Sequence, residues 1–342
     1  LGESLGFNAD GRHYYVYRDY ADNCEYIRNG RELCNDGLHI TLSAYDYHVL
    51  MDFREIRDDD FGTWGKLCHQ LEGRGVASID EEVKQIRFAA LIDSLRSHLE
   101  SSHAVLADGF DKLPPKEAAA ARDAFAAREG LFLAEFAKVA GLDEPLPQTV
   151  LALGKELEYL EAEISRNRPL LMGETSRLLA AAWLALHRIG ESAAGNDSLQ
   201  LVLNFGLQRP LQEELAGEAT AEGDTLAELD VPSVMALFRI LLRHEDFILL
   251  PAEKVLALLP DLLKESDVAL LIGLHAGDGY EWFIKERFVI MLQWLEFAAS
   301  LSAIGNNENF DEKETGRFIK LLTAAAEDAG YRLDRFLKGF EC

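Results

Sequence analysis

The sequence contains little positive charge. Its 342 residues include 34 lysines and arginines against 59 aspartates and glutamates, which gives a formal net charge of −25. Proteins that neutralise nucleic-acid phosphates need clustered lysine and arginine, and an acidic chain repels polyanions and anionic membrane surfaces unless it carries a local basic patch. The sequence has no such patch, so we expect neither nucleic acids nor membranes among its partners.

Long apolar runs and cysteines are also scarce. The longest uninterrupted apolar stretch, Leu178–Leu186, is about half of the roughly 18 residues that a membrane span needs. The four cysteines, Cys24, Cys34, Cys68 and Cys342, are too few and too irregularly spaced for a disulfide scaffold or a zinc ribbon. We therefore expect free thiols in a reducing, cytoplasmic compartment, with a Cys24–Cys34 bridge as the alternative.

Residues 1–60 show the pattern of β-strands. Arg12–Arg18 is rich in aromatic and β-branched residues, and from Tyr45 onward side chains alternate between two faces. Leu38–Leu42 is a further apolar run, which follows the turn signal Asn35-Asp36-Gly37. We expect about three antiparallel strands, in a sheet too small to bury its own face. Either the helices that follow or a neighbour outside this sequence must cover that face.

From residue 61 onward the sequence has the period of helices. Ser78–Glu81 has the spacing of a capping box, and Gly141 stands where a helix end commonly takes a left-handed residue. Leu178–Ile189 is apolar almost all round and predicts a buried helix, and Tyr280–Ala303 predicts a central one. A helix is also expected at Val150–Ile164. We interpret its interleaved acidic residues as a solvated face: Glu156, Glu158, Glu161 and Glu163.

The sequence therefore predicts a mainly α fold. An irregular multi-helix domain at residues 61–342 is expected to follow a small antiparallel β-sheet at residues 1–60. Prolines near residues 141–148 would divide the helical domain into two lobes. Helix lengths and loop spacings vary freely, so a solenoid of fixed repeats is not expected.

Motifs for catalysis and for nucleotide or metal binding are missing. The sequence contains no GxxxxGK[ST], no GxGxxG after a strand and no GxSxG. His98 and His103 lack the spacing that places two ligands on one helix face, and Glu312 stands where a calcium loop at Asn307–Asp311 would need Gly. We therefore expect no metal, no cofactor and no catalytic residue in this chain.

Three aromatic residues are candidates for carbohydrate binding. Trp64, which lies in the glycine-rich segment Phe61–Gly65, and the pair Tyr280 and Trp282 could stack on the apolar faces of sugar rings. For Trp282 a buried core position is the favoured interpretation, whereas for Trp64 the two interpretations have equal weight.

Several segments resemble one enzyme family. Leu38–Glu55 resembles the end of the β-domain that follows the catalytic barrel in α-amylase family (glycoside hydrolase family 13) enzymes, where two strands joined by a tight aromatic turn close the sheet. Phe61–Gly65 and Gly73–Glu81 look like the linker of large bacterial members with a helical C-terminal extension, and Gly279–Phe288 is similar to a stretch of those extensions. The resemblance covers roughly the first ninety residues and this later segment. The family's catalytic Asp nucleophile, Glu acid and third Asp have no matching positions here.

The resemblance implies a non-catalytic, C-terminal portion of a glycoside hydrolase or glucanotransferase that acts on α-glucans. Its partners would be an upstream catalytic barrel of the same polypeptide and an α-glucan, and its helical domain would serve packing, oligomerisation or substrate positioning. The start at Leu1, without Met or a secretory signal, is interpreted as a cut inside a longer protein. The β-rich first segment is then expected to lie against a neighbour that this sequence does not include.

The alternative is a stand-alone helical protein–protein interaction module without a carbohydrate role. A groove between helices would then bind an amphipathic partner helix, and acidic rims would favour basic partners. A third hypothesis, an all-helical enzyme, requires convergent titratable groups that the sequence does not reveal.

Overall fold

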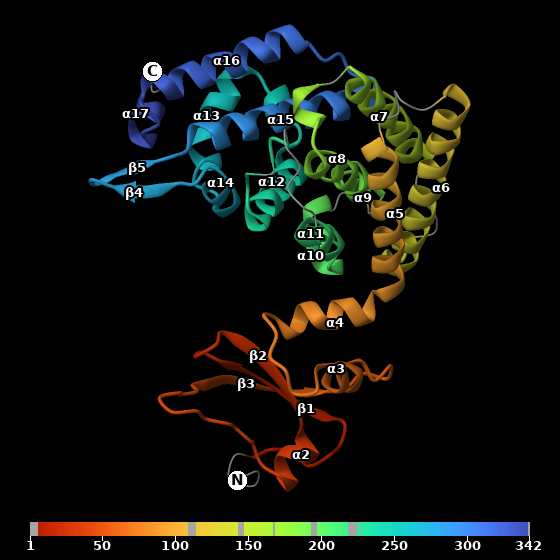
Figure 1. Ribbon diagram of the computed structural model, residues 1–342, viewed down its shortest axis with the longest axis vertical. Helices are drawn as coiled ribbons and strands as arrows, with labels where there is room; N and C mark the ends of the chain where they lie inside the picture. Colours follow the sequence, from red (N-terminus) through yellow and green to blue (C-terminus); the bar gives the residue numbers. More distant parts are fainter. Residues whose placement is uncertain are drawn as a thin grey trace. The chain divides into compact units, whose positions relative to one another are not determined.

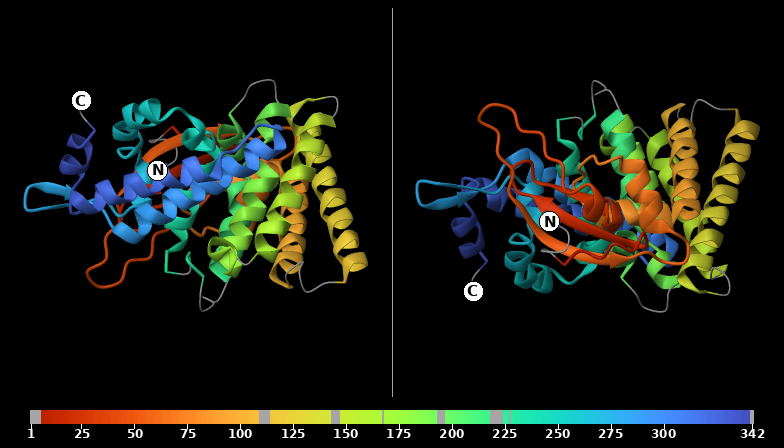
Figure 2. Two further views of the ribbon diagram at one scale, coloured as in Figure 1. Left: turned by 90° about the horizontal axis from the view of Figure 1, so that it is seen from above. Right: turned by 90° about the horizontal axis from the view of Figure 1, so that it is seen from below.

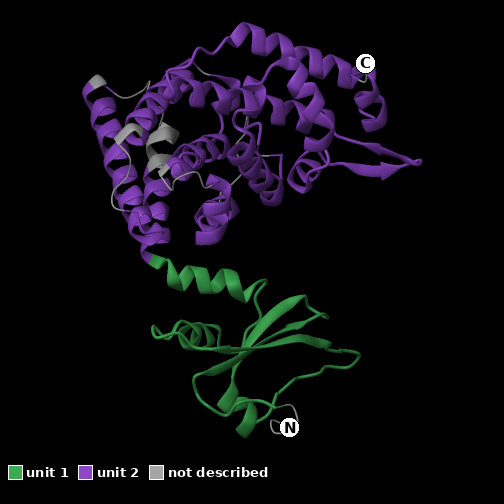
Figure 3. Ribbon diagram, turned by 180° about the vertical axis from the view of Figure 1, so that it is seen from behind, with its two compact units in different colours: residues 1–89 green, residues 90–342 purple. Residues whose placement is uncertain are grey.

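The computed structural model describes residues 6–108, 114–142, 147–166, 168–192, 197–217, 224–226 and 228–340. The chain forms two compact units, Leu1–Ala89 and Ala90–Cys342 (Figure 3). The expected fold class is confirmed, because helices dominate and the described strands include one small antiparallel sheet near the N-terminus (Figure 1).

Unit 1 is built on a three-stranded antiparallel sheet with the order β2-β1-β3. Its elements are β1 (His13–Asp19), β2 (Cys24–Asn29), α2 (Gly30–Asn35), β3 (Leu50–Arg57), α3 (Thr63–Leu71) and α4 (Ile79–Arg87). Because side chains alternate along a strand, Tyr14, Val16 and Ile27 point to one face, where they pack with Leu67 of α3 and Val83 of α4. That face is therefore covered by helices of the same unit.

The boundary between the units lies later than residue 60. Both α3 and α4 belong to the core of the sheet, and the division follows Ala89, where α4 has ended and α5 begins. A sheet of this size is stable only with a packed second layer, and here residues 63–87 supply that layer. The suggested further split near residues 141–148 falls largely on residues outside the described part of the chain.

Two of the expected strand segments are confirmed and one is wrong. Arg12–Arg18 corresponds to β1, and the alternation after Tyr45 becomes β3 from Leu50 onward. Leu38–Leu42 forms no strand; the third strand is Cys24–Asn29. This edge strand carries Glu25, Arg28 and Asn29, so it lacks the apolar run by which a strand is usually recognised.

The described residues of unit 2 are helical apart from one hairpin and the connecting loops. Its elements are α5 (Ala89–Asp108), which begins at the unit boundary, α6 (Pro115–Ala140), α7 (Pro147–Ser165), η2 (Pro169–Leu171), α8 (Glu174–Leu186), α9 (Ile189–Ser192), α10 (Ser198–Phe205), α11 (Gln208–Gly217), α12 (Val231–His244), η3 (Phe247–Leu249), α13 (Ala252–Leu262), α14 (Ser266–Leu271), β4 (His275–Gly277), β5 (Tyr280–Trp282), α15 (Lys285–Gly305), α16 (Glu312–Asp328) and α17 (Leu333–Lys338). Figure 2 shows the β4–β5 hairpin projecting beyond the helices.

The helix ends follow their local signals. Ser78 caps α4, since its Oγ accepts a hydrogen bond from the Glu81 backbone N–H at 3.4 Å. Gly141 closes α6 with a φ of 70°. Residues Leu178–Leu186 of α8 are all buried, as expected. The predicted helix Tyr280–Ala303 needs correction, because Tyr280–Trp282 is a strand and α15 begins only at Lys285.

Helix α15 is the most apolar long helix of unit 2. By length and composition it is the one helix among the described residues that could cross a membrane, but 72% of its most apolar window is buried inside the protein. Core helices of globular domains show the same combination of length and hydropathy, so this helix is weak evidence for a membrane span.

Candidate functional site

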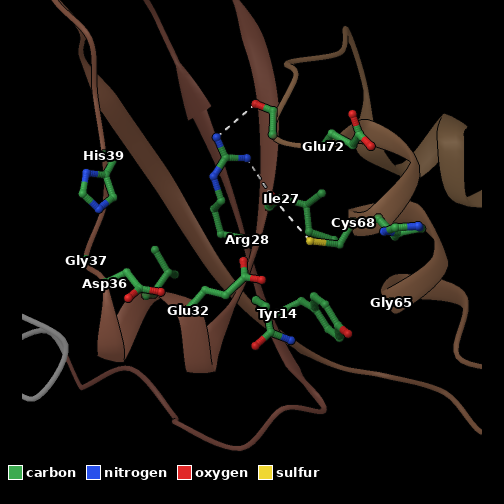
Figure 4. A pocket seen from close by; sticks show the side chains of 14 residues that line it. Tyr14, Ile27, Arg28, Glu32, Asp36, Gly37, His39, Gly65, Cys68 and Glu72 are labelled. Carbon is green, nitrogen blue, oxygen red and sulfur yellow. Dashed lines mark hydrogen bonds between the residues drawn. The ribbon is translucent and has the colours of Figure 1, made fainter.

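Unit 1 contains a cavity of about 610 Å³ between β2, α2 and α3 (Figure 4). Tyr14 of β1 and the backbone of Gly37, Gly65 and Gly73 complete its walls. Its volume lies within the range of about 300–1,000 Å³ that is typical of ligand pockets. The polar and ionisable residues that line it are Tyr14, Arg28, Asn29, Glu32, Asp36, Cys68, His39, His69 and Glu72.

Most of the titratable groups in this cavity have no partner within the described chain. The carboxylates of Glu32, Asp36 and Glu72 and the imidazoles of His39 and His69 form no side-chain hydrogen bond or ion pair with another described residue. Their hydrogen-bonding capacity is open to solvent or to a ligand. The cavity is therefore rich in acceptors that no described residue of unit 1 uses.

Arg28 is fixed along one wall. Its Nη1 donates to the Ile27 carbonyl at 2.9 Å, and its Nη2 donates to the Gly73 carbonyl at 3.0 Å. Gly73 has a φ of +85°, and a Cβ at this position would lie 3.2 Å from Arg28 Nη2. In the view of Figure 4 the guanidinium lies between His39 and Cys68. The arginine is thus held in place before any ligand arrives.

The cavity offers no activated nucleophile. Burial raises the pKa of the Cys68 thiol, and the negative charge of Glu32 raises it further. Burial likewise raises the pKa of Tyr14. Because the thiolate is the reactive form of cysteine, a protonated Cys68 is a poor nucleophile at neutral pH. This arrangement suits binding rather than covalent catalysis.

A second cavity of about 160 Å³ shares Arg28 and His39 with the first. Its other lining residues come from the three strands of the sheet and from the segment before β3: Tyr17, Asp19, Tyr26, Ile40, Thr41, His48 and Leu50. The rings of Tyr17 and Tyr26 lie 5.6 Å apart and nearly parallel, at 12°. Tyr17 is buried, so the half-buried Tyr26 is the ring that is partly open.

The ion pair between Asp19 of β1 and His48 holds the segment before β3 against β1. The buried Asp19 carboxylate pairs with His48 Nδ1 and accepts hydrogen bonds from the backbone N–H groups of Ala21 at 2.9 Å and Val49 at 3.1 Å. Burial alone would raise the pKa of Asp19, but these hydrogen bonds lower it; the hydrogen bond from His48 to Asp19 raises the pKa of His48. Both shifts favour the charged pair.

The outer side of this segment is apolar and exposed. We define the apolar surface of unit 1 as the exposed large side chains of Tyr20, Ile40, Leu42, Tyr45, Tyr47, Val49, Met51 and Phe53. Seven of these eight residues belong to residues 40–53. The eighth, Tyr20, contacts this segment through its backbone N–H, which donates to the Val49 carbonyl at 2.9 Å. Phe53 also stacks on Tyr17 at 4.9 Å, so the surface continues into the aromatic face of the sheet.

Unit 2 contains a buried network of ionisable groups that the sequence did not reveal. Glu156 of α7 is fully buried; its Oε2 lies 2.9 Å from His187 Nε2, and its Oε1 accepts a hydrogen bond from Arg188 Nε at 2.8 Å. His187 Nδ1 lies 2.9 Å from Glu245, and Arg188 also pairs with Glu191. Each ring nitrogen of His187 is thus engaged, so this histidine has no free position for a substrate.

The interpretation of Glu156–Glu163 as a solvated face is therefore wrong for three of its four residues. Glu156, Glu161 and Glu163 are buried, and only Glu158 is exposed. Glu163 pairs with Arg166 at 2.6 Å and with Arg168 at 2.9 Å. Helix α7 packs against α6, α8 and α15, which explains why these three acidic residues are buried.

The three candidate sugar-stacking residues lie in different settings. Trp64 is half-buried and packs against the core of unit 1. Tyr280 and Trp282 lie two residues apart on β5 and therefore on one face of the hairpin. The Arg332 guanidinium lies over the Tyr280 ring at 3.7 Å, and Trp282 Nε1 donates to the Gly277 carbonyl at 3.1 Å. The two hairpin residues belong to unit 2 and Trp64 to unit 1.

The remaining candidate ligands are distributed without a common centre. Among the described residues, no group of three or more His, Cys, Asp or Glu side chains is arranged to hold a metal ion. Cys24, Cys34 and Cys68 are free, so the alternative Cys24–Cys34 bridge is absent, and Cys342 lies outside the described residues.

Comparisons of the chain with protein-family models, with curated proteins and with solved structures found no match. The function must therefore be argued from the geometry of the two units and from the sequence.

Proposed function

We propose that the chain is a non-catalytic portion of an α-amylase-type enzyme acting on α-glucans, in which unit 1 packs against the catalytic barrel. The apolar surface of unit 1 carries this proposal. Monomeric proteins rarely expose large contiguous apolar patches, and those that do so commonly bind a partner there. Met51 is 52% exposed and Phe53 44% exposed although both lie on a strand of the only sheet in unit 1 that the described residues form.

The apolar surface of unit 1 is held in place by contacts within the unit, which favours its binding to a partner. The face of the sheet with Val16 and Ile27 is covered by α3 and α4, whereas Phe53 stacks on Tyr17 of the other face. Met51 pairs in register with Arg18 and exposes its side chain on the edge strand β3. The Asp19–His48 pair and the Val49 backbone hydrogen bonds hold the segment before β3 in one conformation. A surface that is already ordered loses little entropy when a partner covers it.

The identity of the neighbour is argued from sequence. Leu38–Glu55, which contains most of the apolar surface, is the segment that resembles the last part of the β-domain beside an α-amylase barrel. The non-catalytic role agrees with the chemistry of both units, because Cys68 is held protonated and His187 has both ring nitrogens engaged.

Limited proteolysis of two polypeptides tests the proposal. The reading frame is sequenced upstream of Leu1. The rate of chymotrypsin cleavage after Tyr45 and Tyr47 is then measured in this chain and in the longer polypeptide that the extended reading frame encodes. We expect an upstream barrel and at least about tenfold slower cleavage at both tyrosines in the longer polypeptide, which corresponds to about 1.4 kcal/mol of protection. Tyr280, exposed on the unit 2 hairpin, is the internal control. An upstream frame without a barrel, or equal cleavage rates at Tyr45, contradicts the proposal.

A second candidate function is supported by a groove in unit 2. A cavity of about 280 Å³ between η3 and α16 is lined by Leu250, Phe310 and Phe318 and also by the acidic residues Asp311 and Glu314. An apolar groove with an acidic rim fits a basic amphipathic helix. Binding of a lysine-rich amphipathic peptide that weakens with salt and is lost in Phe318→Ala would favour the stand-alone interaction module.

A further inference from the structure

Tyr45 has an unusual backbone conformation for an aromatic residue. Its φ is +71°, in the left-handed region, and its side chain is fully exposed. Bulky residues rarely adopt this conformation, because Cβ then lies too close to the carbonyl oxygen that follows. Since the ring is exposed, burial within unit 1 does not offset this cost. Strained residues of this kind are concentrated at sites of binding and catalysis.

The turn that presents Tyr45 is ordered by its own hydrogen bonds. The backbone N–H of Asp46 donates to the Ser43 carbonyl at 3.1 Å, and the Ser43 N–H donates to Oδ2 of Asp46 at 3.0 Å. The ion pair between Asp19 and His48 attaches the chain to β1 three residues after the tyrosine. The exposed ring is therefore carried by an ordered segment, which lowers the entropy that is lost when a partner binds it.

We infer that Tyr45 is the anchor residue of the apolar surface of unit 1 and inserts into a preformed apolar pocket of the folded domain that covers this surface. The inference rests on the proposed function for the presence of such a domain in the same polypeptide, but it does not require that domain to be a catalytic barrel. A few residues carry most of the binding energy of an interface, and tyrosine is one of the types enriched among them.

The area of the apolar surface fits a folded domain better than a small ligand. Its aromatic members Tyr20, Tyr45, Tyr47 and Phe53 are 54%, 103%, 69% and 44% exposed. Because an aromatic side chain can bury about 150–250 Å², these four alone offer roughly 400–700 Å². With the four aliphatic members added, the surface approaches the about 800 Å² that each partner contributes to a standard protein–protein interface.

The charge of this surface indicates the chemistry of the partner. Residues 38–53 contain no lysine or arginine, and their two carboxylates, Asp46 and Asp52, are exposed. Interface cores contain few charged residues, and charged groups of opposite sign face each other across an interface. The pocket is therefore expected to be apolar with lysine or arginine at its rim. It also needs a hydrogen-bond partner for the phenolic hydroxyl of the anchor.

A second copy of this chain fits the surface less well. In a symmetric dimer the same patch of both subunits meets, so Asp46 and Asp52 of one copy would face the same residues of the other. Residues 38–53 supply no lysine or arginine to offset this repulsion. A different folded domain with a basic rim avoids it.

Hydrogen exchange in the longer polypeptide tests the inference. Backbone amides of residues 46–53 are expected to exchange more slowly there than in this chain, and added salt is expected to weaken this protection. Tyr45→Ala is expected to reduce the protection at least about tenfold. Phe61→Ala is the matched control, because Phe61 is an 82% exposed aromatic residue of unit 1 outside the apolar surface; it should leave the protection unchanged.

A second variant separates anchoring from a role in folding. Asn tolerates the left-handed conformation, so Tyr45→Asn is expected to leave this chain at least as stable in urea as the native protein. In the longer polypeptide the same substitution is expected to reduce the protection of residues 46–53 at least about tenfold. A residue needed only for folding would instead lower the stability of this chain.

Three results would overturn the inference. They are a reading frame that adds no folded domain, native protection of residues 46–53 that is absent in the longer polypeptide, and protection that Tyr45→Ala and Tyr45→Asn leave unchanged. Failure of the proposed function is a separate observation. An upstream domain other than a barrel contradicts that function, while the dependence of protection on Tyr45 is still measured and decides whether this residue is the anchor.

Discussion

Nε2 of His187 lies 2.9 Å from Oε2 of Glu156, and both side chains are completely shielded from solvent. The same carboxylate accepts hydrogen bonds from Arg188, so one buried negative charge holds two positive groups. Because α7 carries the glutamate and the end of α8 carries its partners, the pair connects segments 31 residues apart in sequence. Buried ion pairs of this kind are costly to break one partner at a time.

Replacement of Glu156 is therefore expected to destabilise unit 2 severely. Glu156→Gln keeps the size of the side chain but leaves His187 and Arg188 as buried positive charges without their main counter-charge. The expected loss is about 3–5 kcal/mol in the free energy of unfolding. Urea denaturation followed by circular dichroism measures it.

Glu158→Gln is the matched control for this substitution. Glu158 is exposed on the same helix, so its replacement is expected to change the free energy of unfolding by no more than about 0.5 kcal/mol. Equal effects of the two substitutions would show that the buried network contributes no specific stability.

The stability of unit 2 is expected to depend on pH through His187. Burial alone would lower the pKa of His187, but the charges of Glu156 and Glu245 and the hydrogen bonds with both outweigh it and raise the pKa to about 9. Because the folded-state pKa exceeds the unfolded value of about 6.5, this stabilisation is complete below about pH 6.5 and is lost as the pH rises through 9.

The pH dependence is isolated by comparison with His187→Gln. The difference in unfolding free energy between the native protein and this variant is expected to be largest near pH 6 and to shrink toward about pH 10. Unfolding curves at several pH values between these limits give the difference. A difference that stays constant would mean that folding leaves the pKa of His187 unchanged.

Glu161 is expected to behave in the opposite way. Burial, with a further contribution from the charge of Glu158, raises its pKa to about 7 against the opposing effect of Arg122. The folded state then favours the neutral carboxyl, so ionisation costs stability as the pH rises from the unfolded pKa of about 4.5 through 7. Glu161→Gln removes that cost and is expected to be more stable than the native protein by about 1–2 kcal/mol at pH 8, with little difference at pH 5.

Glu163→Gln provides the contrast on the same helix. Its carboxylate is paired with Arg166 and Arg168, so the substitution is expected to lower stability at pH 8. Thermal melts of both variants at the two pH values test this contrast. Stabilisation by both substitutions, or by neither, would contradict a raised pKa of Glu161.

Helix α7 shows what the sequence could and could not predict. Its existence follows from apolar residues spaced three and four apart, but the environment of Glu156 depends on residues more than thirty positions away. One signal was available: an all-round apolar helix ends in His187–Arg188, and two cations at the end of a buried helix require buried counter-charges. Local periodicity cannot say which helix supplies them.

The β4–β5 hairpin shows a signal that the helical interpretation overlooked. Asp278-Gly279 is the dipeptide of a two-residue hairpin turn, and both residues adopt positive φ, 51° and 78°. The apolar residues Tyr280, Trp282 and Phe283 continue into the pattern of α15, which hides the strand. Correct placement puts Tyr280 and Trp282 on one face, whereas a helix would separate them by about 200°.

The cavity between β2, α2 and α3 could not be derived from the sequence for a different reason. Its residues come from β2, α2, the segment after α2 and α3, and β2 itself was missed because an edge strand tolerates charged residues. The small sheet and the helix cap at Ser78 were predictable from local patterns; the cavity between them depends on tertiary packing.

A glycine of α15 makes room for the buried network, which gives a final test. A Cβ at Gly305 would collide with Oε1 of Glu156 and Nη2 of Arg188, so Gly305→Ala is expected to cost about 1–3 kcal/mol despite the better helix propensity of alanine. At Gly154, on α7, no atom lies within 4 Å of such a Cβ, and Gly154→Ala is expected to stabilise the protein by up to about 1 kcal/mol. Urea denaturation of both variants measures the two changes; equal stabilisation by the two substitutions would show that α15 does not pack against Glu156 and Arg188 as described.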